Sequence, residues 1–193
     1  MKNIAILTGG DSEERVISLK SSAVVKKYLD PARFRVFEID IKGSDWHELD
    51  SGAQVDKNDF SIKIGRKKVR FDAAFAALHG APLENGQLQG YLEMMGVPYT
   101  CCDGFVSALT MNKAATKALL APYGVPMAPS FLLKKGELVD LPKLATLGLP
   151  VFVKPNDHGS SFGVSKVKTV AELPKAIEYA FSFSENVMVE AFM

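Results

Sequence analysis

The stretch Pro150-Val-Phe-Val-Lys-Pro-Asn-Asp-His-Gly-Ser-Ser-Phe-Gly163 decides how the second half of the chain is interpreted. Its apolar run, 151–153, predicts a short buried strand that ends near Pro155, because proline has no N–H to donate to a sheet. The glycines and serines after it predict a loop whose backbone can approach a ligand closely. Lys154 beside such a loop suits a phosphate chain. A solvated lysine beside an ordinary glycine turn is equally compatible with these residues.

Bulk composition indicates a globular protein with no nucleic-acid or membrane partner. The 193 residues carry a formal net charge of +1, with 47% hydrophobic and 23% charged residues. So small a net charge gives no electrostatic basis for binding nucleic acid or an acidic membrane surface. No apolar run approaches a transmembrane span, and residues 1–8 are too short and too strand-like for a signal peptide. Cys101 and Cys102 are adjacent, so we expect reduced, partly buried thiols in a cytoplasmic protein.

The N-terminal half predicts a doubly wound α/β sheet. Residues 3–8 predict a buried parallel strand, Gly9-Gly10 a turn, and the residues after them a helix with Asp11 or Ser12 as its N-cap. The expected buried face of this helix consists of Val16, Leu19, Ala23 and Val24. Strand, glycine turn and helix open a Rossmann-like fold, although the G-x-G-x-x-G spacing of dinucleotide-binding proteins is absent.

Further segments extend this pattern. Residues 34–41 predict a second strand, 43–59 an irregular polar region, and 60–71 an exposed hairpin with a basic turn. Residues 73–78 predict a central strand buried on both faces.

Two polar side chains stand where ligands bind in such sheets. Glu14, near the predicted helix start, suits an ammonium group, and a carboxylate that merely complements the helix dipole is equally compatible. His79 follows the strand at 73–78, at the carboxyl edge of the sheet. We weigh a ligand-binding and a structural role for this histidine equally.

The second half predicts a smaller α+β unit. The helical pattern over 114–123 ends at Gly124, which fits the C′ position, and Pro126 follows. We therefore place the domain boundary here, giving domains 1–123 and 124–193. Short strands and two helices, at 137–147 and about 170–181, make up the rest.

Four motifs, in order over nearly the whole chain, resemble the D-alanine–D-alanine ligase family of the ATP-grasp superfamily. They are Gly9-Gly10-Asp11-Ser12-Glu13-Glu14-Arg15-Val16-Ile17-Ser18-Leu19, then His79-Gly80 with Glu84–Gly90 and Pro98–Thr100, then Met111-Asn112-Lys113, and finally Val153–Gly163. The second motif departs from the family pattern, because Leu83 and Asn85 stand where a glycine and an aspartate are usual. The resemblance implies an N-terminal pre-ATP-grasp domain followed by an ATP-grasp subdomain, truncated before the C-terminal catalytic domain.

The resemblance also implies roles for matching residues. Those assigned to catalysis or the first D-alanine are Glu14, which would hold the ammonium group, Ile17, His79 near the carboxyl group, and Ser160. Those assigned to ATP are Lys113 and Lys154 on the phosphates, Ser160 and Ser161 in a closing loop, and Glu190 through Met193 around the adenine.

The implied reaction is ATP-dependent joining of two D-alanines for peptidoglycan precursor synthesis. One carboxylate attacks the γ-phosphate to give an acyl phosphate, and the amine of a second D-alanine displaces phosphate. Positioning and charge neutralisation dominate such phosphoryl transfers, with Mg²⁺ bridging the phosphates. A homodimer is expected for the full-length enzyme. The second substrate, D-alanine, D-lactate or D-serine, stays open.

The chain stops at Met193, and the family's magnesium-binding residues lie beyond that point. No cluster of Asp, Glu and Asn within 1–193 replaces them. We therefore expect no metal site in this chain and no ligase activity from this polypeptide alone. Two other functions stay open: another ATP-grasp carboxylate–amine ligase, or a non-catalytic α/β ligand-binding module.

Overall fold

The computed structural model describes residues 1–193, which form two compact units, Met1–Ala108 and Leu109–Met193. The units divide inside α3 (Gly104–Met111), whereas the sequence placed the domain boundary at 123/124. The next helix, α4 (Lys113–Leu120), therefore belongs to the second unit.

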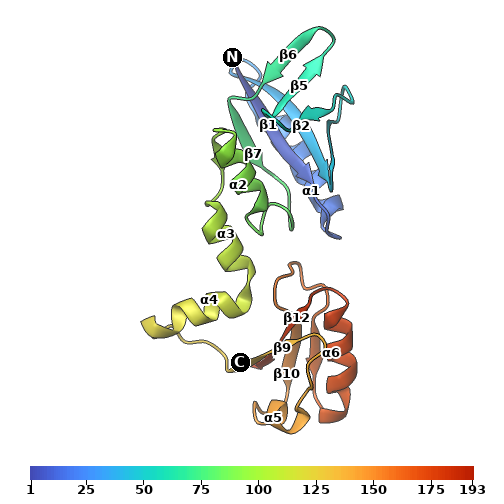
Figure 1. The fold of residues 1–193 in the computed structure, drawn as a ribbon, viewed down its shortest axis with the longest axis vertical. Helices are drawn as coiled ribbons and strands as arrows, with labels where there is room; N and C mark the ends of the chain where they lie inside the picture. The colour runs from blue at the N-terminus through green and yellow to red at the C-terminus, as the bar shows by residue number, and fades with distance from the viewer. The chain divides into compact units, whose positions relative to one another are not determined.

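The first unit is built on a five-stranded sheet with the order β3-β2-β1-β7-β8 (Figure 1). β1 pairs in parallel with β2 and β7, and β7 with β8, whereas β3 runs antiparallel to β2. The strands are β1 (Lys2–Gly9), β2 (Phe34–Lys42), β3 (Asp45–Glu48), β7 (Ala73–Ala76) and β8 (Tyr99–Thr100). The predicted doubly wound, mainly parallel sheet is confirmed, although β7 is shorter than expected and only Ala74 within it is fully buried.

One face of this sheet packs against an apolar core. Phe37, Ile39 and Ile41 of β2 belong to this core, together with Leu88 and Leu92 of helix α2 (Gln87–Met94). Because side chains alternate along a strand, the residues between them, at 38 and 40, point to the opposite face, where helix α1 (Arg15–Tyr28) lies.

Helix α1 buries its polar side, which is the reverse of the prediction. Val16 and Val24 are exposed, and the buried residues of the helix are Ser18 and Ser22. The reason is the sheet face beneath it, where Ser22 Oγ donates a 2.7 Å hydrogen bond to the buried carboxylate of Glu38. A helix above buried carboxylates must present hydroxyl and basic groups, so apolar spacing identified the helix and not its inner face.

The helix also starts later than predicted. Asp11 accepts a hydrogen bond from Gly43 N at 2.6 Å, and Ser12 Oγ accepts one from Glu14 N at 3.3 Å. Neither is the N-cap: the helix begins at Arg15, with Glu14 in the cap position. Asp11, Glu13 and Glu14 therefore precede the helix and can contact loops or a ligand.

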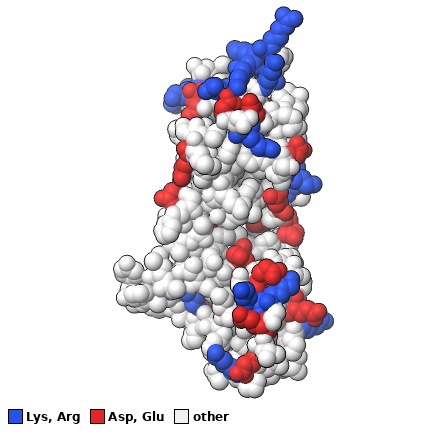
Figure 2. Space-filling view, in the orientation of Figure 1, with Lys and Arg blue, Asp and Glu red and all other residues white.

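The region predicted to be irregular contains β3 and one further short strand, which joins the predicted hairpin in a second, small sheet. This sheet has the order β4-β5-β6, with β4 (Val55–Asp56), β5 (Ser61–Ile64) and β6 (Lys67–Arg70). β5 and β6 form the predicted antiparallel hairpin. Figure 2 shows Lys and Arg side chains gathered over this hairpin, and residues 66–68 of its turn are all exposed, as expected for a solvated turn.

The second unit has a four-stranded antiparallel sheet with the order β11-β10-β12-β9. Its elements are β9 (Ser130–Lys134), β10 (Val151–Pro155), β11 (Ser165–Val167), β12 (Asn186–Ala191), α5 (Leu141–Ala145), α6 (Leu173–Phe181), and the 3₁₀ turns η1 (Ala121–Tyr123) and η2 (Val170–Glu172). One face packs on α5 and α6 through a core that includes Val151, Val153, Leu173 and Ile177 (Figure 1). The alternate side chains of β10, at 152 and 154, therefore face the other way.

Three smaller observations complete the fold. Cys101 and Cys102 are free, and both are exposed rather than partly buried as predicted. None of the helices has the length and apolar character needed to cross a bilayer. No group of three or more His, Cys, Asp and Glu side chains is arranged to hold a metal ion.

Candidate functional site

The first group of predicted site residues meets at the start of α1. Glu14 is 5% exposed, and a Cβ placed on Gly80 would lie 2.9 Å from its Oε2 atom and 2.5 Å from Ser12 Oγ. The carboxylate therefore lies directly over the backbone that follows β7. Ile17, one helical turn later, is half-exposed on the same side of the helix. A buried carboxylate suits a ligand cation.

His79 is held against the same helix by two serines. Its backbone N–H donates to Ser18 Oγ at 2.9 Å, and its Nε2 lies 3.0 Å from Ser21 Oγ, with the donor set by the tautomer. Glu14, Ser18 and Ser21 are spaced for one helical face. The structure thus places Glu14 and His79 at neighbouring contacts between α1 and the segment after β7, with Ile17 one turn further along the helix.

Arg15 fixes the start of this helix to the sheet. Its guanidinium group makes a bidentate ion pair with Asp40, at 2.7 and 2.6 Å, and the Asp40 side chain is 4% exposed. A Cβ on Gly9, which has a φ of +88°, would lie 2.2 Å from Asp40 Oδ1. Only glycine fits beside this ion pair, which explains the glycine at the end of β1. The pair ties the first residue of α1 to β2.

The second group of site residues lies on the sheet face of the second unit that is turned away from α6. Glu190 of β12 forms ion pairs with Lys154 of β10 and with Lys117 of α4, the latter at 2.7 Å. Lys117 also donates to the carbonyl of Ala128. Burial by itself would raise the pKa of Glu190, but its hydrogen bonds to the two lysines outweigh burial and hold that pKa below its usual value.

Lys113 is tied to the backbone that follows β10. Its Nζ donates to the carbonyl of His158 at 2.8 Å and to that of Asn156 at 3.4 Å. Burial lowers the pKa of Lys113, and the positive charge of Lys154 lowers it further. A pair of cations that disfavour one another's charge gains when an anion binds between or beside them.

Asn156 connects the segment after Lys154 to the helix that carries Lys113. It is 2% exposed, its Oδ1 accepts from Ala114 N at 2.9 Å, and its Nδ2 donates to Asn112 Oδ1 at 2.8 Å. Asn112 in turn is the N-cap of α4, which carries Lys113. The loop after β10 is therefore hydrogen-bonded to the N-terminus of α4.

The predicted phosphate loop has a constrained backbone. Ser160 and Ser161 both have positive φ, +46° and +60°, which is uncommon for residues with a side chain. Gly163 closes the loop against Pro155 and Phe183, because a Cβ on it would lie 2.6 and 2.7 Å from their side-chain carbons. Backbone strain of this kind clusters at ligand clamps and other functional sites.

Sequence reasoning missed two members of this second group. Lys117 lies four residues after Lys113, and that spacing on a helix puts both ammonium groups on one side. Asn156 directly follows Lys154 and Pro155, and nothing in the sequence except this position indicates its role. Met193, predicted to contact adenine, follows β12 and is 81% exposed.

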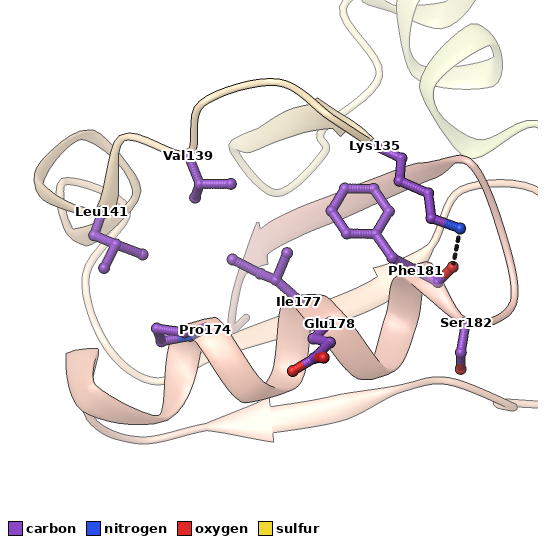
Figure 3. Close-up of a pocket in the computed structure, with 8 residues that line it drawn as sticks. All are labelled: Lys135, Val139, Leu141, Pro174, Ile177, Glu178, Phe181 and Ser182. Carbon is purple, nitrogen blue, oxygen red and sulfur yellow. Dashed lines mark hydrogen bonds between the residues drawn. The ribbon is translucent and has the colours of Figure 1, made fainter.

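A cavity of about 560 Å³ lies elsewhere in the second unit and contains none of the predicted residues. Figure 3 shows Val139 and Leu141 facing Ile177 and Phe181 across it, with Lys135 at one end donating to the Phe181 carbonyl at 3.4 Å. It lies on the α6 side of the sheet, whereas Lys154 and Glu190 lie on the other side.

Two family models match the chain: D-ala D-ala ligase N-terminus over residues 3–102 and D-ala D-ala ligase C-terminus over residues 119–193. The chain belongs to the D-alanine–D-alanine ligase family. The motifs carrying Glu14, His79 and Lys154 fall within the matched ranges, whereas Lys113 and Lys117 lie between them.

Individual relatives agree with this assignment. The chain is 45% identical to the D-alanine–D-alanine ligase of Flavobacterium johnsoniae, over all of this chain and 61% of the relative. It superposes on D-alanyl-alanine synthetase A of Vibrio cholerae with a TM-score of 0.90 at 31% identity, over all of this chain and 59% of that one. A D-alanine–D-alanine ligase of Bacillus anthracis complexed with ATP gives a TM-score of 0.79 at 27% identity, over all of this chain and 60% of that one. The chain thus spans about 60% of the length of its relatives.

Proposed function

We propose that this chain supplies the first-substrate site and the phosphate-binding site of a D-alanine–D-alanine ligase. The observation that carries the proposal is the pair of clusters within a chain of this family: a buried carboxylate, Glu14, over Gly80, and the lysines around Glu190. Residues 1–123 would form the substrate-binding domain and residues 124–193 the ATP-grasp subdomain, although Lys113 lies in the second compact unit.

The first cluster suits the amino end of D-alanine. The carboxylate of Glu14 would hold the ammonium group, because opposite charges attract strongly where they are shielded from water. Ile17 would contact the methyl group, and His79, oriented by Ser21, would lie near the carboxyl group. This arrangement leaves the substrate carboxylate free to attack phosphorus.

The second cluster suits ATP. Lys113 and Lys154 would contact the phosphates, Ser160 and Ser161 would belong to the loop that closes over them, and Glu190 with Met193 would hold the adenine. An anion restores a favourable environment for Lys113, whose pKa is lowered by burial and by Lys154. In the reaction, a carboxylate oxygen of the first D-alanine bonds to the γ-phosphorus as the bond to ADP breaks. The amine of the second D-alanine then attacks the acyl carbon, and inorganic phosphate leaves.

The rest of the proposal concerns the metal, the cellular location, the assembly and the second substrate. Magnesium would accompany ATP through its phosphates, but no set of side chains in this chain forms a metal cluster, so we derive no step through the metal. We further propose a cytoplasmic, homodimeric enzyme of peptidoglycan precursor synthesis whose second substrate is D-alanine.

The test joins residues 1–193 to the part of the Flavobacterium johnsoniae relative that lies outside the aligned region. ADP release by this chimera is followed with a coupled assay while D-alanine and ATP are varied separately. Losing a hydrogen bond to a charged group costs about 1.5–3 kcal/mol, which corresponds to about 10- to 100-fold in affinity. We expect Glu14→Gln to raise KM for D-alanine by this factor with little change for ATP, and Lys154→Met to do the reverse.

Two exposed residues provide matched controls. Glu13→Gln removes an adjacent exposed acid, and Lys175→Met removes an exposed lysine of α6; both should leave the two KM values unchanged. Equal activity with other amino acids would favour a different ATP-grasp ligase. ATP and D-alanine binding without any ADP release would favour a non-catalytic module.

A further inference from the structure

A second pocket lies in the first unit, at the carboxyl edge of the parallel sheet. Its walls include residues from the segments that come after three strands: Asp11 after β1, Gly43 after β2, and Pro82 in the loop between β7 and α2. The chain winds from β1 to β2 on one side and to β7 on the other, so this is the topological switch point of the sheet. Ligands of open α/β sheets bind in the crevice at such a point.

This pocket is separate from the cluster around Glu14. Glu14 and His79 belong to the side of the sheet covered by α1. The pocket instead takes Leu88 and Tyr91 from α2, which packs against the opposite face. None of the residues assigned above to D-alanine or ATP lines it.

Its aromatic walls are fixed in place. The rings of Trp46 and Tyr91 meet edge to face with their centroids 5.1 Å apart. Trp46 Nε1 donates to the Gly43 carbonyl at 2.9 Å, and the Tyr91 hydroxyl donates to the Lys57 carbonyl at 2.9 Å. Burial raises the pKa of Tyr91 to about 12, so this hydroxyl keeps its proton. A ligand therefore meets a preformed apolar wall, which reduces the entropic cost of binding.

The pocket is also lined by one acidic and one basic side chain, Asp11 and Lys57. Asp11 uses Oδ1 to accept from Gly43 N, which leaves its second oxygen for a ligand. Lys57 donates one hydrogen bond to the Ser44 carbonyl at 2.6 Å, and an ammonium group has three donors. The side-chain amide of Gln87 adds a neutral donor and acceptor. A ligand that carries both charges can pair with both groups, whereas a ligand with one charge can pair with only one of them.

The volume limits the size of the occupant. The cavity measures about 350 Å³, near the lower end of the roughly 300–1,000 Å³ typical of ligand pockets. That space suits an amino acid or a dipeptide and is small for a nucleotide. We propose that this pocket binds a small zwitterion, an amino acid or dipeptide, with its ammonium group on Asp11, its carboxylate on Lys57 and its apolar part against Trp46 and Tyr91.

The test uses Trp46, which is the single tryptophan of the chain and reports directly on the pocket. Residues 1–193 are titrated with D-alanine and with D-alanyl-D-alanine, while tryptophan emission and the indole N–H resonance are followed. Ethylamine and propionate, each with one of the two charges, serve as comparison probes. We expect a saturable change with at least one zwitterion, and binding at least tenfold weaker for both single-charge probes.

Variants locate the binding. Asp11→Asn keeps an oxygen for Gly43 N–H, and Lys57→Met keeps the aliphatic stem; each should weaken zwitterion binding at least tenfold. Lys63→Met, an exposed lysine of β5, should change nothing. Lys57→Arg, which keeps the charge, should retain binding and so separates charge loss from misfolding.

Glu14→Gln distinguishes this pocket from the proposed substrate site. The proposal predicts that this variant keeps the zwitterion response. A response lost with Glu14→Gln and unchanged in Asp11→Asn and Lys57→Met would overturn it, as would the absence of any saturable change in both signals. The inference does not rest on the proposed ligase function, because binding is measured on this chain without turnover.

Discussion

Replacing Glu190 with glutamine removes the negative charge that Lys117 and Lys154 share. The carboxylate pairs with both ammonium groups, and all three side chains are largely buried, with 17% of Glu190, 20% of Lys117 and 22% of Lys154 exposed. Glutamine has nearly the same shape, so the change leaves packing intact. We expect Glu190→Gln to destabilise the second unit by leaving two neighbouring cations without a counter-charge.

The magnitude follows from the contacts. A hydrogen bond to a charged group contributes about 1.5–3 kcal/mol, and partial exposure argues for the lower end of that range. The glutamine oxygen can still accept from one lysine, so we expect a net loss of about 1.5–2 kcal/mol. For a domain of roughly 60–100 residues, each kcal/mol lowers Tm by about 4–8 °C, which gives a fall of about 6–16 °C.

The assay is thermal unfolding at neutral pH, followed by calorimetry and circular dichroism. Tryptophan fluorescence is an internal control, because the only tryptophan, Trp46, lies in the first unit and should report no change. Glu185→Gln is the matched variant, since Glu185 pairs with Lys135 at the surface, 3.2 Å apart, and such pairs contribute about 0–1 kcal/mol. Equal shifts for the two variants would refute the reasoning.

The effect also has a defined pH dependence. The pKa of folded Glu190 is lowered from 4.5, so the folded state binds fewer protons than the unfolded state as the pH falls. The stabilisation is therefore complete above pH 4.5 and is lost as the pH drops through the folded pKa. The difference in Tm between wild type and Glu190→Gln should persist at pH 6 and shrink towards pH 3 (about one to two units below the unfolded pKa). A difference that grows on acidification would contradict the assignment.

Three further substitutions probe the surroundings of the two clusters. Gly163→Ala, at a φ of +72° with Pro155 Cγ 2.6 Å from the new Cβ, should cost about 1–3 kcal/mol in urea unfolding; a wild-type midpoint would rule out the tight packing. Asp40→Asn leaves Arg15, 29% exposed, without its ion pair, and should cost about 2 kcal/mol by tryptophan fluorescence; no change would show that the pair does not anchor the helix. Asn156→Ala leaves the half-buried backbone N–H of Ala114 without its acceptor and should cost about 1–3 kcal/mol by circular dichroism; a neutral result would contradict its role.

The parallel sheet could be predicted because its strands are continuous apolar runs followed by glycine turns. Residues 3–8 and 34–41 fall within β1 and β2 almost residue for residue. The inner face of α1 could not be predicted in the same way. Its partners, Glu38 and Asp40, come from another strand, so the burial of serines depends on tertiary contacts that helical periodicity does not contain.

The site residues also divide into those that the local sequence indicates and those that depend on tertiary contacts. Glu14 and His79 could be assigned to the ligand-binding edge of the sheet because each lies in a segment that follows an apolar run. Lys117 could not, since its partner Glu190 is 73 residues away in sequence. Asn156 likewise acts through Asn112, on a different element. Local pattern locates residues within elements, whereas ion pairs between elements appear only once the strands are in register.

Product formation by the chimera of residues 1–193 with the Flavobacterium johnsoniae relative tests the central claim most directly. The chimera is incubated with ATP and D-alanine, and the products are identified by mass spectrometry beside the ADP assay. We predict D-alanyl-D-alanine and ADP in equal amounts, and no product when L-alanine replaces D-alanine. ADP release without dipeptide, or equal dipeptide formation from L-alanine, would contradict the assignment of this chain to a D-alanine–D-alanine ligase.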